Sequence, residues 1–134
     1  MISLSLSTHD RVTLLEVTSL VEKALAASGL TEGAVLVYCP HTTAGVTVNE
    51  NADPTVRRDI AMALERLVPI DLPFAHLEGN SDAHVKASMM GSSVTVPVEA
   101  GRLVLGTWQG IYFAEFDGPR HRRFLVQPLS GQRA

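Results

Sequence analysis

The sequence predicts an α+β fold: largely antiparallel, packed β-sheets with helices on one side, in a single compact domain. Three observations predict it. Stretches with the period-two or fully apolar pattern of strands outnumber stretches with helical spacing. The helical stretches occur singly, as excursions between predicted strands. Short turns rich in glycine, proline and acidic residues connect the strands of the last third, and such connections favour antiparallel neighbours.

The first half of the chain contains four predicted strands and one helix. Residues 2–7 alternate apolar side chains with serine, and residues 11–17 are the expected hairpin partner. A Thr-Ser pair is expected to cap a helix that begins at residue 18 or 19, runs to about residue 27 and stops at a glycine. Residues 34–39, apolar on both faces, and residues 45–49, which alternate, are the next two strands.

The second half begins with the best-marked helix of the chain. Asp53 supplies an N-cap carboxylate, and Pro54 stands in the first turn, where its missing N–H has no cost. This helix is expected to end before Pro69. A loop over residues 68–80 leads to a short helix, capped by Ser81 or Asp82 and ending near Met90. The remaining predicted strands cover residues 93–98, 103–108, 110–117 and 121–127.

Composition narrows the class of protein. A chain of 134 residues, 46% apolar and 19% charged, is expected to fold as one domain over residues 1–134. Its formal net charge of −3 argues against a nucleic-acid partner, which would need a basic face. No stretch has the roughly 20 apolar residues of a membrane span, and the N-terminus lacks the basic start of a signal peptide. With its single cysteine, the chain is expected to be cytoplasmic.

The most unusual stretch runs from Cys39 to Pro54. Core packing does not require its polar residues, which stand among Thr, Ala and Gly: His41, Asn49, Glu50, Asn51 and Asp53. A ligand or metal site would require them. Asp53 also has the simpler role of helix cap, whereas Glu50, between two asparagines at a strand end, could act as a base or bind a cation.

Three histidines lie in polar or loop contexts: His41, His76 and His84. Imidazole is the commonest protein ligand for zinc-type metals, and three such ligands with an open position form a catalytic metal site. The spacing matches no local metal motif, so single histidines bonded to nearby backbone or carboxylates are the competing interpretation. Glu78 is a further acid in this region, equally interpretable as a solvated loop residue.

Two other features bear on a binding site. Trp108 and Gln109 lie between glycines, where the indole could stack on a ligand ring or pack under a bend. The basic run from Arg120 to Arg123 alternates in direction along its strand, which favours a solvated or intersubunit edge, with a phosphate clamp as the alternative. Lys86, near His84, is a candidate for binding an anionic cofactor or substrate, and Cys39 is expected to be a buried, inert thiol.

Three stretches together resemble the YjbQ-like family, a family catalogued as uncharacterised and sometimes labelled secondary thiamine-phosphate synthase. They are residues 41–53, residues 76–86 with His-Leu-Glu-Gly-Asn and Ala-His-Val-Lys, and residues 101–120 with Gly-Thr-Trp-Gln-Gly. The resemblance covers nearly the whole chain in the same order. It implies a compact α+β fold, a homotrimer and a site near the histidines that holds a divalent metal.

Residue by residue, the resemblance implies His41, His76 and His84 as metal ligands. It implies five site-lining residues: Glu50, Asn51, Asn80, Trp108 and Gln109. Three imidazoles suit zinc better than magnesium, which prefers carboxylates. The first hypothesis is therefore a metal-dependent enzyme, a transferase or hydrolase acting on a phosphorylated or anionic small molecule, with Glu50 as general base. A non-catalytic anion-binding protein is the second hypothesis, and a structural oligomer without a site is the third.

Overall fold

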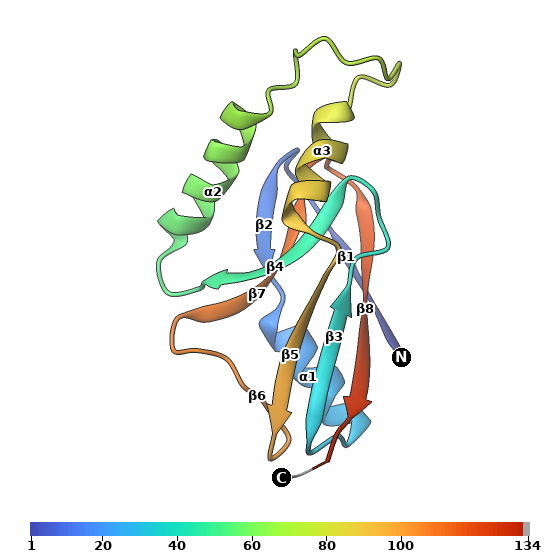
Figure 1. The fold of residues 1–134 in the computed structure, drawn as a ribbon, viewed down its shortest axis with the longest axis vertical. Coiled ribbons are helices and arrows are strands. Elements are labelled where there is room, and N and C mark those ends of the chain that lie inside the picture. Colours follow the sequence, from blue (N-terminus) through green and yellow to red (C-terminus); the bar gives the residue numbers. More distant parts are fainter. Residues whose placement is uncertain (133–134) are drawn as a thin grey trace.

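The computed structural model describes residues 1–132, which form eight strands and three helices (Figure 1). In chain order they are β1 (Ile2–Ser7), β2 (Thr13–Glu16), α1 (Thr18–Ser28), β3 (Gly33–Tyr38), β4 (Ala44–Glu50), α2 (Pro54–Leu67), α3 (Ser81–Met90), β5 (Ser93–Glu99), β6 (Arg102–Leu103), β7 (Gln109–Glu115) and β8 (His121–Ser130).

The strands form two sheets in which every pairing is antiparallel. The five-stranded sheet has the order β1-β8-β3-β5-β6, and the three-stranded sheet has the order β2-β7-β4. The α+β class and the antiparallel pairing expected from the sequence are thereby confirmed. In Figure 1, α2 and α3 lie in the upper half of the view, level with the upper ends of the strands, and β4 runs from beside α3 towards the start of α2.

Strand β7 separates two apolar cores. Its Ile111 and Phe113 pack with the inner face of the five-stranded sheet and with Val21 and Leu25 of α1. Its Tyr112 and Ala114 pack against α3, with α2 also contributing. Because both faces of β7 are covered, its side chains are buried from Gly110 to Glu115.

Local sequence signals predicted some of the helix ends correctly and others wrongly. Asp53 caps α2 as expected, since its Oδ1 accepts from the Thr55 backbone N–H at 2.9 Å. Gly29 ends α1 with φ +72°, a left-handed conformation that favours glycine. The cap predicted for α1 is wrong: Val17 is the N-cap, and the Thr18 hydroxyl instead donates to Glu16 Oε2 at 2.9 Å. Helix α3 is capped by neither Ser81 nor Asp82, because its N-cap is Asn80.

Two strand predictions are corrected. Residues 2–7 and 11–17 do not form a hairpin: β1 pairs with β8 in one sheet, and β2 pairs with β7 in the other. The predicted strand over residues 103–108 is reduced to β6, and the chain then turns before β7. Among residues 1–132, no helix is both long and apolar enough to cross a lipid bilayer.

Candidate functional site

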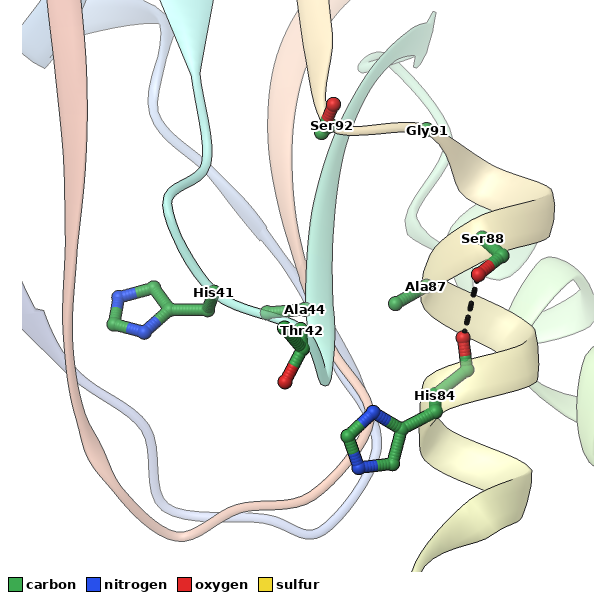
Figure 2. Close-up of a pocket in the computed structure, with 8 residues that line it drawn as sticks. All are labelled: His41, Thr42, Ala44, His84, Ala87, Ser88, Gly91 and Ser92. Atoms are coloured by element: carbon green, nitrogen blue, oxygen red, sulfur yellow. Dashed lines mark hydrogen bonds between the residues drawn. The ribbon is translucent and has the colours of Figure 1, made fainter.

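A cleft of about 440 Å³ opens between the β3–β4 turn, the loop before α3 and the start of β8. We call it the histidine cleft, and its lining residues are Pro40, His41, Thr42, Thr43, His76, Glu78, Asn80, His84, Arg120 and Arg122. An adjoining pocket shares His41, Thr42 and His84 and extends along α3 to Ser88 and Ser92 (Figure 2). Segments far apart in the sequence therefore contribute to one concave surface.

A buried ion pair fixes the back of the cleft. Arg122 donates from Nε to Glu115 Oε1 at 2.9 Å and from Nη2 to Glu115 Oε2. The same Nη2 also donates to Thr43 Oγ1 at 2.8 Å. Arg122 thus ties β7 and β8 to the turn that carries His41. Its side chain is 5% exposed and that of Glu115 is fully buried, so Arg122 does not form the solvated edge expected from the sequence.

The charge state of Glu115 follows from its partners. Burial alone would raise the pKa of this carboxyl, but Arg122, the Thr8 hydroxyl and the Asp117 backbone N–H all donate to it. Their net effect holds the pKa of Glu115 below its usual value. The pair is therefore ionised at neutral pH.

His41 is held against β8. Its Nε2 lies 3.0 Å from the Arg123 N atom and 3.1 Å from the Arg123 O atom, so this ring nitrogen is engaged with backbone in either tautomer. Figure 2 shows its ring pointing away from His84. Burial and the nearby Arg122 charge lower the pKa of His41, which favours the neutral imidazole.

His76 and His84 are brought together. Their ring centroids are 5.6 Å apart with the planes at 89°, an edge-to-face arrangement. Glu78 is the neighbouring acid, with Oε2 3.8 Å from His76 Nε2. Two of the three predicted ligands thus form a pair, on the loop before α3 and on α3 itself.

The fit to a metal ion is partial within one chain. The donor pair His76 and His84 is of the kind that suits zinc. The three imidazoles do not converge, however, because His41 is bonded to Arg123. Across residues 1–132, no group of three or more His, Cys, Asp or Glu side chains is placed to hold a metal ion. The three-histidine site implied by the resemblance is not formed in this arrangement.

Lys86 lies on the other face of α3 from His84, since residues two positions apart in a helix point in nearly opposite directions. Its Nζ donates to Asp82 Oδ2 at 2.9 Å, and Arg11 donates two bonds to the same carboxylate. Burial alone would raise the pKa of Asp82, but the bonds from Arg11 and Lys86 lower it overall. Lys86, 1% exposed, lines a separate hollow of about 270 Å³ beside Arg11 and Glu65.

The other predicted residues form a second group at the far end of β4. Ala44 borders the adjoining pocket, whereas Glu50 lies six residues along the strand, roughly 20 Å away. There Glu50 is paired with Gln109, and the Asn51 N–H donates to the Trp108 carbonyl at 2.8 Å. Trp108 is 62% exposed, so it is not packed under a bend. Of the five site-lining residues, only Asn80 lies in the histidine cleft.

Sequence reasoning missed Glu115 and Thr43 as parts of the site. One signal was available for Glu115: it is the single charged residue in the strand Gln109–Glu115, which is otherwise buried and apolar after its first position. A buried carboxylate requires a partner. The partner of Glu115 is Arg122, and nothing in the sequence indicates that Thr43 is a second hydrogen-bond acceptor for this arginine. Cys39 is buried at 1% exposure, as expected, and burial raises the pKa of its thiol.

Comparison with known proteins gives one consistent family. UPF0047 protein YugU of Bacillus subtilis is 51% identical over 128 residues, covering 95% of this chain and 97% of that protein. A UPF0047 protein of Methanocaldococcus jannaschii is 50% identical over 122 residues, covering 91% and 88%. No activity is given in either name.

Solved structures agree with the fold. An uncharacterised conserved protein of the YjbQ/UPF0047 family from Clostridium acetobutylicum has a TM-score of 0.93 and 53% identity, covering 95% of this chain and 98% of that one. A hypothetical protein from Aeropyrum pernix has a TM-score of 0.92 and 40% identity, covering 96% and 97%. The family model described as UPF0047 protein YjbQ-like matches residues 2–131. The chain therefore belongs to the YjbQ-like UPF0047 family.

Proposed function

We propose that this protein is a small metal-dependent enzyme that acts on a phosphorylated or otherwise anionic small molecule in the histidine cleft. One observation carries the proposal: two arginines and three histidines line the cleft against a single carboxylate, Glu78. Arginine guanidinium groups bind phosphate and carboxylate groups, and neutral imidazoles are the commonest protein ligands for zinc-type metals.

Within this proposal each residue has a distinct role. Arg120, the exposed arginine of the pair, orients the anionic group of the substrate. His84 and His76 are placed to act beside that group, because they are close together and line the same cleft. Glu50, the general base expected from the sequence, lies too far along β4 to reach a substrate bound there by the same chain. A transferase of the thiamine-phosphate synthase kind and a hydrolase both remain within this reaction class.

His76 and His84 are also the residues that would hold a zinc-type ion, with Glu78 as the nearest acid. When bound, such an ion supplies a Lewis acid beside the anionic substrate. The test is zinc titration of chelator-treated protein by calorimetry. We expect His76→Ala and His84→Ala to lose binding, and His41→Ala to keep it.

A matched control comes from an exposed histidine outside the cleft, His9, whose change to alanine should leave zinc binding intact. Wild type that binds no zinc, in titration and in elemental analysis, would end the metal proposal. The anion proposal is tested separately by the thermal shift with inorganic phosphate and pyrophosphate. Stabilisation of wild type but not of Arg120→Gln supports it, and stabilisation without any turnover of phosphate esters favours the non-catalytic binding protein.

The resemblance also leads us to propose a homotrimer in the cytoplasm. The apolar surface of α2 and the loop after it supports assembly: no α2 side chain is fully buried, and Met62, Leu67, Ile70 and Leu72 are exposed. Light scattering should give three times the 14.4-kDa chain mass. A monomeric mass across the working concentration range would reject the trimer.

A further inference from the structure

Asn80 is the buried polar residue of the histidine cleft whose bonding is incomplete. It is 8% exposed, and its Oδ1 has no hydrogen-bond partner among the described residues. Its Nδ2 donates to Asp117 Oδ2 at 2.8 Å. Because an ionised carboxylate only accepts, the amide nitrogen must face Asp117 and the oxygen must be the free atom. Asn80 lines the cleft, so this unpaired acceptor lies buried in the cleft wall, and the bond to Asp117 fixes the amide.

The unpaired oxygen of Asn80 is more unusual because of where this residue stands in the fold. Asn80 is the N-cap of α3, where asparagine normally accepts from a backbone N–H of the first turn. Its side chain makes no such bond, although Asp53 at the matching position of α2 does. An uncapped helix end and an unpaired buried acceptor both destabilise the free protein. Residues that break a local rule in this way concentrate at functional sites.

Neighbouring bonds keep the amide in place. Arg120 donates from Nη2 to Asp117 Oδ2 at 2.9 Å and from Nε to the Asp117 carbonyl at 2.8 Å. Arg120 itself lines the cleft. The Arg120 guanidinium and the Asn80 amide nitrogen thus donate to one carboxylate, which fixes the relative position of the two side chains. Such a pair recognises an anionic group and a hydrogen-bond donor on the same molecule.

We infer that Asn80 determines specificity by accepting a hydrogen bond from a hydroxyl or amino group of the ligand. The ligand class is then a small phosphorylated compound that carries such a donor a few bonds from its phosphate. This inference rests on the function proposed above and adds the requirement for a donor. A ligand without one leaves the Asn80 oxygen buried and unpaired, and sites of this kind reject such analogues.

The test compares glycerol 3-phosphate with propyl phosphate, two three-carbon esters that differ in their hydroxyl groups. Affinities are measured by calorimetry with a metal chelator present. We expect wild type to bind glycerol 3-phosphate about tenfold more tightly. In Asn80→Ser the preference should fall below about threefold, with propyl phosphate bound within about twofold of wild type. Asn49→Ser, which changes an exposed asparagine of β4, should keep the preference.

The Tm of ligand-free Asn80→Ser serves as a folding control, because serine removes the unpaired amide oxygen and also the bond to Asp117. A purely structural role would weaken the binding of both probes equally, which would overturn the inference.

The affinities of wild type for the two probes also test the inference without any variant. Equal affinity for the two probes overturns the inference and leaves the proposed function standing. Binding of neither probe, with the chelator or with added zinc, refutes the proposed function itself, and the inference with it. A preference that appears only after zinc is added would assign the oxygen to a metal ion and would equally overturn the inference.

Discussion

Replacement of Arg122 by methionine should destabilise the protein strongly. The change leaves the fully buried Glu115 carboxylate without its cation, and Thr43 Oγ1 without a donor. Removing one partner of a buried ion pair costs about 3–5 kcal/mol, because the remaining charge stays buried. We therefore expect Arg122→Met to lower the free energy of unfolding by about 4 kcal/mol at pH 7.

Two variants distinguish the effect of breaking the ion pair from the general effect of removing an arginine side chain. Arg123→Met changes the exposed neighbour on the same strand and should stay within about 0.5 kcal/mol of wild type. The double variant Arg122→Met with Glu115→Met replaces the pair by apolar groups, and such replacements are often neutral. It should recover at least about 2 kcal/mol relative to Arg122→Met.

The assay is urea unfolding followed by circular dichroism at one fixed protein concentration. The pH dependence gives an independent check. The pKa of Glu115 is lower in the folded protein than its ordinary value of 4.5, so the pair stabilises above about pH 4.5 and this contribution is lost as pH falls through the folded pKa. The deficit of Arg122→Met should therefore be largest at pH 7 and narrow towards pH 4. A loss below about 1 kcal/mol at pH 7, or a double variant no more stable than Arg122→Met, would refute the reasoning.

Three further predictions concern α3, the β3–β4 turn and β4. Asp82→Asn strips the buried Lys86 of its acid partner, whereas Lys86→Met leaves Asp82 bonded to Arg11; urea unfolding should show the larger loss for Asp82→Asn. The pKa of His41 is lowered by folding, so its protonation in the unfolded chain costs stability as pH falls below about 6.5; His41→Gln should flatten the Tm profile there, and an unchanged profile would contradict this. Gly45→Ala places a Cβ 2.5 Å from the Gly91 carbonyl oxygen, a backbone atom that cannot rotate away, so its Tm should fall well below wild type.

Local patterns predicted most of the secondary structure. The Asp53-Pro54 start of α2 and the alternating strand β1 are both found as expected. Pairing was harder, because alternation shows that a strand has one buried face but not which strand lies beside it. Residues 2–7 fit a hairpin with residues 11–17, yet they pair with β8, more than a hundred residues away.

The site was predicted in part for a related reason. His76 and His84 lie eight positions apart on a loop and the helix after it, so proximity in sequence indicated proximity in space. Glu50 is nearly as close to His41 in sequence, but the extended strand β4 carries it to the opposite end of the sheet. Composition alone does not distinguish a polar cluster that folds together from one divided by a strand.

The two N-caps show what the motif around Asn80 does not reveal about this residue. Asp53 and Asn80 both stand before the first turn of a helix, although the sequence predicted the cap role for Asp53 and placed the cap of α3 at Ser81 or Asp82. Asp53 fulfils it because the nearest partner of its carboxylate is the Thr55 backbone N–H. Asn80 does not, because its amide nitrogen donates to Asp117, 37 positions away, and its oxygen accepts no bond from the helix. A residue suited to a local role and kept from it by a distant partner is a better indicator of function than a polar residue whose role is satisfied, and Asn80 is such a residue in the histidine cleft.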